Sequence, residues 1–134
     1  MALNQRVSEW TDQNNVIEWF YLQYPKELII KIPNDLIRSP LQGVFNRRNG
    51  LVAGVPDLLV AAIRCSFGAM FLEMKRAKAV GKRRGYISEN QQKIMELLRA
   101  KGYHCVVAYG FEDAANAIKS YMDENVGGFS NASR

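Results

Sequence analysis

The chain has 134 residues, of which 48% are hydrophobic and 23% are charged, and these values are typical of one globular domain spanning residues 1–134. They exclude a mainly disordered chain, and every apolar run is shorter than the ~20 residues that cross a membrane. The 18 lysines and arginines outnumber the 13 acidic residues, and the net charge of +5, with a pI of 9.4, indicates an anionic partner such as nucleic acid.

The first predicted element is a helix over residues 8–24, with Ser8 as its N-cap and Pro25 as its stop. Gln13 falls on the apolar face of this helix, and its simplest interpretation is a glutamine at the edge of the core that bonds to backbone. The other members of that face, at helical spacing, are Trp10, Ile17, Phe20 and Tyr24.

Three strands are predicted next. Residues 27–32 read as a strand, residues 33–56 as a loop or mixed segment, and residues 57–63 as a second strand. A turn at residues 66–68 leads into a third strand over residues 69–75, so the second and third strands are expected to form a hairpin.

The clearest helix covers residues 88–101. Ser88 and Gln91 fit the capping-box pattern at its start, and Gly102 occupies the position after its end where glycine is favoured. Gln91 also falls on the side of the helix that carries the apolar stripe, which we expect to contain Ile94, Leu97 and Leu98.

A strand over residues 103–109 and a helix over residues 113–123 complete the predicted core of residues 8–122, and residues 125–134 form an expected flexible tail. The order helix, strand, strand, strand, helix, strand, helix predicts an α/β domain: a small mixed sheet flanked by helices.

Two carboxylates and a lysine are placed at one end of the predicted hairpin. Asp57 opens one strand, while Glu73 and Lys75 end the next and point to the same face. Adjacent carboxylates repel unless a cation or a proton lies between them, and Mg²⁺ prefers such oxygen ligands. The structural alternatives are a turn or cap role for Asp57 and an exposed cross-strand charge pair for Glu73 and Lys75.

The remaining reactive side chains are expected to be structural. His104 is the only histidine and opens an apolar strand, where a packed histidine is the simpler interpretation. Cys65 and Cys105 are too few for a disulfide framework or a zinc quartet, and we expect reduced, buried thiols in a cytoplasmic protein. The N-terminal segment turns polar at once, so no signal peptide is expected.

Four segments in order resemble the VRR-NUC domain family of the PD-(D/E)xK nuclease superfamily, which includes stand-alone phage and bacterial members. They are GVPDLLV (54–60), GAMFLEMK (68–75), ISENQ (87–91) and GYHCVVAYGFEDA (102–114), with a further likeness over residues 8–25. The resemblance implies a restriction-endonuclease-like core and a metal-dependent nuclease.

The resemblance also assigns roles to residues of the hairpin and the following helix. It implies that Asp57, Glu73 and the backbone carbonyl of Met74 bind Mg²⁺ or Mn²⁺, that Lys75 is the catalytic lysine, and that Gln91 reaches into the site. This role of Gln91 and its capping-box role do not exclude each other.

The first helix often supplies an acid in this family. Here the best-matching position holds Gln13, which is flanked by Asp12 and preceded one turn earlier by Glu9. A glutamine can hold a metal-bound water, but it brings no charge.

Basic residues follow the catalytic strand directly. Residues 75–84, KRAKAVGKRR, hold six of the 18 lysines and arginines and no acid, which is either a solvated face or a surface for phosphates. Gly81 and Gly85 are expected to keep this loop mobile until DNA arrives. The predicted DNA contacts are Lys78, Lys82, Arg83 and Arg84, with a second rim of Arg38, Arg47 and Arg48.

The sequence therefore predicts a small cytoplasmic deoxyribonuclease of a bacterium or bacterial host, with water as nucleophile. The family resemblance, and not the residues themselves, implies branched, flapped or junction DNA as substrate. The aromatic residues of the first helix exceed one face, so some are expected to be exposed or at an interface, while core packing explains most of them. The resemblance to stand-alone members of the family implies a homodimer that covers the rest. The alternatives are a DNA-binding module that does not cleave and a nuclease subunit that needs a partner. No nucleotide cofactor is expected, because neither G-x-x-x-x-G-K-[ST] nor G-x-G-x-x-G occurs.

Overall fold

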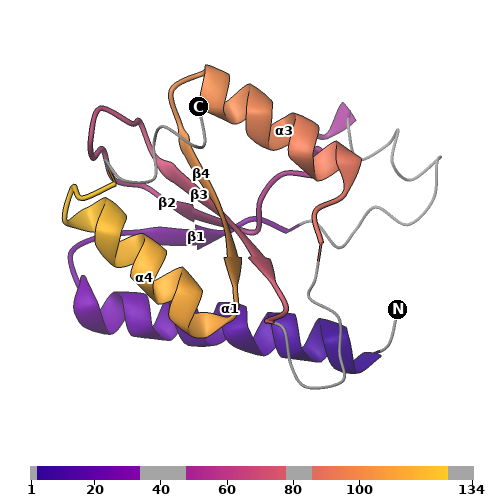
Figure 1. Ribbon diagram of the computed structural model, residues 1–134, viewed down its shortest axis with the longest axis horizontal. Helices are drawn as coiled ribbons and strands as arrows, with labels where there is room; N and C mark the ends of the chain where they lie inside the picture. The colour runs from indigo at the N-terminus through magenta and orange to yellow at the C-terminus, as the bar shows by residue number, and fades with distance from the viewer. Residues whose placement is uncertain (1–2, 34–47, 78–85, 127–134) are drawn as a thin grey trace.

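The computed structural model describes residues 3–33, 48–77 and 86–126, and within them it confirms the predicted order of elements (Figure 1). Most of the predicted DNA contacts, together with Gly81, Gly85 and nearly all of the predicted tail, lie outside these ranges. The elements are α1 (Leu3–Gln23), β1 (Ile29–Lys31), β2 (Leu58–Val60), β3 (Met70–Lys75), α3 (Glu89–Ala100), β4 (His104–Tyr109) and α4 (Phe111–Met122).

The four strands form one mixed sheet in the order β1-β2-β3-β4. β1 and β3 both run antiparallel to β2, and the predicted hairpin of β2 and β3 is confirmed. β3 and β4 are parallel and are connected through α3. This is the small mixed sheet flanked by helices that the sequence predicted, and it is consistent with a restriction-endonuclease-like α/β fold.

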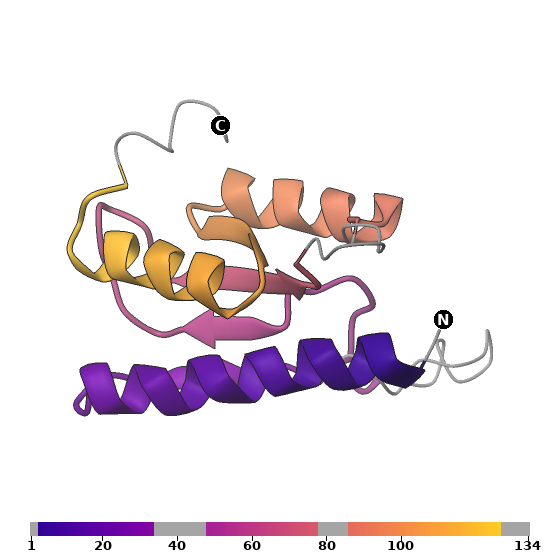
Figure 2. The ribbon, with the colours of Figure 1, turned by 60° about the horizontal axis from the view of Figure 1, so that its bottom comes forward.

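The two faces of β3 serve different purposes. Met70, Leu72 and Met74 belong to the hydrophobic core together with residues of α1 and α4. The alternating residues point to the other face of the sheet, where Glu73 contacts α3. Figure 2 shows the sheet lying between α1 on one side and α3 on the other.

The start of α1 differs from the prediction. The helix begins at Leu3, so Ser8 lies inside it and is not the N-cap. Its buried stripe runs through Gln13, Val16 and Phe20, at the spacing of three and four that faces a sheet. Trp10 lies beside this stripe and remains 55% exposed, with the ammonium of Lys31 5.6 Å from the centre of its ring. In α3 Leu97 is also exposed, contrary to expectation, and Met95 is the buried residue.

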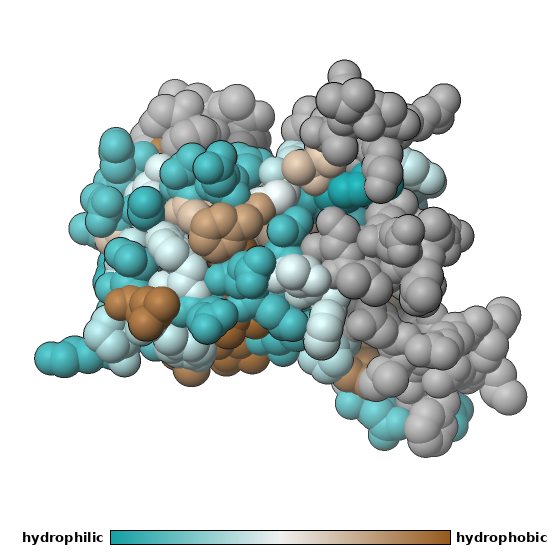
Figure 3. Space-filling model, turned by 90° about the horizontal axis from the view of Figure 1, so that it is seen from below, coloured by the Kyte–Doolittle hydropathy of each residue, from teal (hydrophilic) through white to brown (hydrophobic). Residues whose placement is uncertain are grey.

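The aromatic residues of α1 have partners within the chain. Trp19 packs edge-on against Tyr24 and Phe111, and the hydroxyl of Tyr21 donates to the carbonyl of Ile29 over 2.8 Å. Figure 3 shows the α1 side of the molecule, where apolar residues form separate spots in a mostly polar surface. These aromatic residues therefore do not require a second copy of the chain to cover them. Within the described ranges no helix is long and apolar enough to span a membrane.

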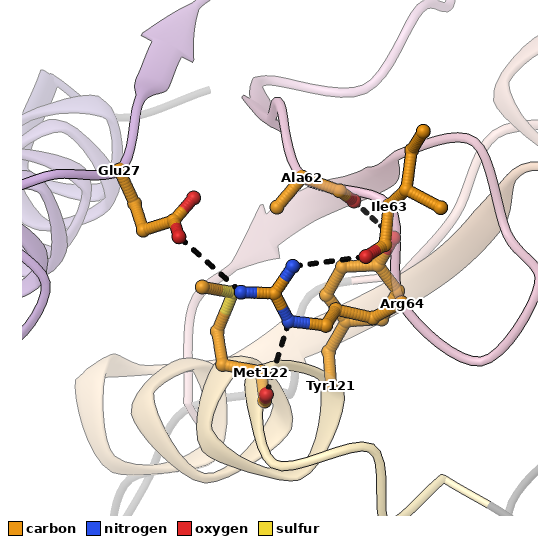
Figure 4. A network of polar contacts seen from close by, with 6 residues as sticks. All are labelled: Glu27, Ala62, Ile63, Arg64, Tyr121 and Met122. Carbon is orange, nitrogen blue, oxygen red and sulfur yellow. Dashed lines mark hydrogen bonds and ion pairs between the residues drawn. The ribbon is translucent and has the colours of Figure 1, made fainter.

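Arg64 makes a network of polar contacts beside the C-terminal end of α4 (Figure 4). Its guanidinium donates to the carbonyls of Met122 and Ile63 over 3.2 and 2.9 Å and pairs with Glu27 at 3.2 Å. Met122 is the last residue of α4, where carbonyls lack a partner within the helix and carry partial negative charge. Beside it the Tyr121 hydroxyl donates to the carbonyl of Ala62 over 2.6 Å. Arg64 thus ties the hairpin to two other segments.

Arg64→Ala is expected to lower the free energy of unfolding by about 1–2 kcal/mol, because it removes two backbone hydrogen bonds and a half-buried ion pair. Urea unfolding followed by circular dichroism measures the loss. Lys93→Ala is the control, since its ion pair with Glu89 is exposed and contributes only about 0.3–0.5 kcal/mol. Equal losses in the two variants would show that the Arg64 network contributes no more than a surface pair.

Candidate active site

Asp57 and Glu73 meet where the pairing of β2 with β3 ends. The last register pair in this direction is Leu58 with Leu72, and Asp57 and Glu73 are the next residue on each strand. A carboxylate oxygen of Asp57 accepts a hydrogen bond from the backbone N–H of Met74 at 2.9 Å. The prediction that the two carboxylates lie at one end of the sheet is therefore confirmed.

Glu73 is buried, with only 3% of its surface exposed. Its Oε1 accepts a hydrogen bond of 2.8 Å from the side-chain amide of Gln91 and lies 3.4 Å from the ammonium of Lys75. The predicted common face of Glu73 and Lys75 is confirmed. An exposed cross-strand pair is excluded, because both side chains are largely covered.

The surroundings of Glu73 oppose its ionisation. Burial, followed by the nearby charge of Asp57 and a smaller effect of Glu9, raises the pKa of Glu73 to about 8, although Lys75 acts in the opposite direction. The second oxygen, Oε2, is also buried and has no hydrogen-bond partner among the described residues. Such an oxygen lacks the positive partner that would stabilise its charge.

Gln91 makes the capping box and a hydrogen bond to Glu73 with one side chain. Its Oε1 accepts from the backbone N–H of Ser88, and its backbone N–H donates to the Ser88 hydroxyl, which completes the capping box at the start of α3. The Nε2 group of the same amide donates to Glu73. The local capping motif therefore fixes the orientation of a group that contacts the buried carboxylate.

Gly54 allows α3 to approach the segment that precedes Asp57. Its φ of +87° lies in the left-handed region that favours glycine. A Cβ atom on Gly54 would lie 2.8 Å from Nδ2 and 3.1 Å from the backbone oxygen of Asn90, which is in the first turn of α3. Only a glycine permits this contact, which brings the first turn of α3 against the loop leading to β2.

Gly54→Ala is expected to lower the free energy of unfolding by about 2–4 kcal/mol, the sum of the left-handed backbone cost and a steric overlap. Gly50→Ala is the matched control: Gly50 has a φ of +84° with nothing within 4 Å of its Cβ position, so only the backbone cost of about 1–2 kcal/mol applies. Urea unfolding of both variants gives the difference. Equal losses would mean that Asn90 moves aside without cost.

On the α1 side of the site, the predicted burial of Gln13 is confirmed, and Glu9, noted in the sequence only as a neighbour of Gln13, acts on Glu73. Gln13 is buried as predicted, but its Oε1 has no hydrogen-bond partner among the described residues, so the backbone-bonded interpretation is wrong. Gln13 also makes no hydrogen bond to Asp57 or Glu73 within the described structure. Glu9, one turn earlier on the same stripe, instead lies near enough to raise the pKa of Glu73. The i, i+4 spacing from Gln13 was the available signal for it.

The other predicted residues lie away from this cluster or outside the described ranges. Asp12 is half-buried off the stripe, and burial raises the pKa of its carboxyl. Arg48 is exposed, whereas Arg38, Arg47, Lys78, Lys82, Arg83 and Arg84 lie outside the described residues.

His104 and Cys105 are buried, as expected, whereas Cys65 is only half-buried, contrary to expectation. His104 is buried between Phe67 and Tyr121, with ring centroids 4.9 and 5.6 Å away. It pairs with Met70, three residues before Glu73 along β3, which is about 10 Å along a strand. Cys105 is a free, buried thiol, and burial raises its pKa to about 11.

The donor set at this end of the sheet fits a hard divalent cation. Asp57 and Glu73 provide carboxylate oxygens, and the buried Oε2 of Glu73, which has no hydrogen-bond partner in the described part of the chain, would gain one from a cation. No group of three or more histidine, cysteine or acidic side chains that could hold a metal occurs in the described ranges. Mg²⁺ is nevertheless often bound by only one or two carboxylates, because it keeps several water ligands.

Comparisons with known proteins identify the family and the fold. The family model of the VRR-NUC domain matches residues 2–112, a range that includes the hairpin, α3 and β4. A solved structure described as a VRR_NUC domain protein shares the fold, with a TM-score of 0.68, 24% sequence identity, and coverage of 87% of this chain and 89% of that chain. No curated protein matches the chain. With most of its length matched by the family model, this chain belongs to the VRR-NUC domain family of nuclease domains.

Proposed function

We propose that this chain is a Mg²⁺- or Mn²⁺-dependent endonuclease that hydrolyses DNA phosphodiester bonds. The observation that carries the proposal is Glu73, a buried carboxylate held beside Asp57 and Lys75, with one oxygen that has no hydrogen-bond partner among the described residues. Burying a carboxylate costs stability whether or not it has a function, and perturbed carboxylates of this kind cluster at active sites, where the function explains why the cost is kept. Membership of a nuclease domain family also supports a nuclease activity.

Asp57, Glu73 and the backbone carbonyl of Met74 would hold the cation, with Glu9 acting from the α1 side. These residues would hold a divalent cation whose chemistry would be a lowered pKa of a coordinated water and an offset of charge on the phosphate. Gln91 keeps Glu73 in place through its 2.8 Å hydrogen bond. Lys75, whose ammonium lies 3.4 Å from Glu73 Oε1, orients the attacking water and offsets negative charge that develops on the phosphate.

We infer that DNA is bound through its backbone and shape. The net charge of +5 supports contact with phosphates, and the sequence contains no zinc-finger, recognition-helix or RNA-binding aromatic motif. Branched, flapped and junction DNA are the proposed substrates, and binding is expected to weaken steeply with salt.

A homodimer remains a prediction, for which light scattering at micromolar concentration is the test.

The test is cleavage of labelled four-way, flapped and linear DNA in Mg²⁺, Mn²⁺ or EDTA. Asp57→Asn is the matched variant, because asparagine keeps an oxygen that can accept from the Met74 N–H while removing the charge. We expect metal-dependent cleavage by the natural chain and a loss of at least ~10²-fold in the variant. Binding to DNA without cleavage would favour the binding module or a missing partner subunit.

A further inference from the structure

The hydrogen-bonding direction of β2 can be followed to the end of the sheet. The carbonyl of Asp57 accepts from Ile32, and the N–H of Ala61 donates to Leu28, so both residues direct backbone groups toward β1. Because direction alternates along a strand, Leu58 and Val60 direct theirs toward β3, where they oppose Leu72 and Met70.

Pro56 occupies the position at which the next hydrogen-bonded pair would form. Continuing the register two residues beyond Leu58 and Leu72 makes Pro56 the partner of Met74, although β2 ends at Leu58 and the chain bends at Asp57. In a regular ladder residue 56 would donate its N–H to the carbonyl of Met74 and accept from the Met74 N–H. Proline has no N–H, so the first bond cannot form. The second is replaced, because the Met74 N–H donates to the side chain of Asp57 at 2.9 Å.

The carbonyl of Met74 is thereby directed toward Asp57 without its ladder donor. The N–H and the carbonyl of one strand residue point to the same side, and the Met74 N–H points to Asp57. The following carbonyl, that of Lys75, is directed the other way and accepts from the N–H of Gly110 at 3.0 Å. Of the carbonyls of Met74 and Lys75, only that of Met74 therefore faces the carboxylates.

We propose that Pro56 is a positioning residue that keeps the Met74 carbonyl available as a cation ligand by withholding the N–H that would otherwise occupy it. The inference rests on the proposed metal site. Pro56 is itself fully buried, so its ring also packs in the interior, and the experiment must separate this packing from the missing N–H.

Residues 74–75 form the single Met–Lys pair in the sequence, which permits a direct readout. Protein labelled with ¹³C-carbonyl methionine and ¹⁵N-lysine gives one NMR correlation, from the carbonyl of Met74. We expect titration with Mg²⁺ to move this resonance in the natural chain. Pro56→Ala restores the N–H, so the Met74 carbonyl resonance should differ from that of the natural chain before metal is added. The Mg²⁺ concentration at the midpoint of the titration should rise about fivefold to tenfold, because Mg²⁺ must then displace one backbone hydrogen bond.

Two further variants separate the causes. Pro56→Val restores the N–H with a larger apolar side chain and replaces Pro56→Ala if that variant does not fold. Pro25→Ala, at an exposed turn after α1, should leave the midpoint unchanged. Equal midpoints in the natural chain and the folded Pro56 variants would overturn the inference while leaving the metal site intact. A Met74 resonance that ignores Mg²⁺, in a chain that cleaves DNA with Mg²⁺, would overturn it too. A chain that shows neither a Mg²⁺ shift of the Met74 resonance nor Mg²⁺-dependent DNA cleavage would instead reject the proposed function.

Discussion

Replacing Glu73 by glutamine is expected to abolish DNA cleavage and, at the same time, to stabilise the protein at pH 8. Glutamine cannot supply the negative oxygen of a cation site, so we expect cleavage to fall by ~10³-fold or more. The same substitution removes a carboxylate that is buried beside Asp57 and has an oxygen without a partner among the described residues. One change should therefore move activity and stability in opposite directions.

The pH dependence of this stabilisation follows from the raised pKa. Glu73 titrates near 8 in the folded chain and near its ordinary value of 4.5 when unfolded. Below pH 4.5 the carboxyl is protonated in both states and carries no penalty. Between pH 4.5 and 8 the unfolded state releases the proton first, so the stability of the natural chain falls as the pH rises.

Thermal unfolding in EDTA from pH 5 to pH 8 measures this effect. We expect the natural chain and Glu73→Gln to have similar Tm values at pH 5, and the variant to unfold about 5 °C or more above the natural chain at pH 8. Adding Mg²⁺ at pH 8 should raise the Tm of the natural chain only. A variant that is less stable at every pH would show that ionised Glu73 stabilises the fold, contrary to this interpretation.

Lys75→Met is expected to reduce cleavage by ~10²- to 10³-fold while leaving the fold intact. Methionine preserves most of the aliphatic length but removes the ammonium that lies 3.4 Å from Glu73. Because Lys75 lowers the pKa of Glu73, its removal raises that pKa further and weakens cation binding at pH 7.

The weakened cation binding gives Lys75→Met a specific signature. Raising the pH ionises Glu73, so Mn²⁺ affinity in the variant should recover by pH 9, whereas cleavage at saturating Mn²⁺ should stay low. Lys93→Met, which removes an exposed lysine of α3, is the control and should cleave normally. Normal cleavage by Lys75→Met would exclude Lys75 from the reaction.

The features that the sequence predicted correctly depend on short-range patterns. The capping box of Ser88 and Gln91 is a four-residue motif, and the hairpin of β2 and β3 follows from two apolar runs and a turn. The pairing of Asp57 with Glu73 then required only the hairpin register and the alternation of side chains.

The features that it missed depend on contacts between distant segments. The rotation of α1 about its own axis places Glu9 near Glu73 and leaves Trp10 exposed. The sequence does not determine this rotation, because the buried stripe of the helix includes the polar Gln13. The burial of Glu73 likewise depends on α3 approaching closely at Gly54, which no local pattern reveals.

The most direct test of the central claim is single-turnover cleavage of a labelled flapped duplex by the natural chain and by Glu73→Gln, each in Mg²⁺ and in EDTA. The proposed site predicts cleavage only by the natural chain in Mg²⁺, with a 5′-phosphate or 3′-phosphate product identified by ligation. Equal cleavage in EDTA, or cleavage by Glu73→Gln at the rate of the natural chain, would contradict a metal-dependent nuclease centred on Glu73.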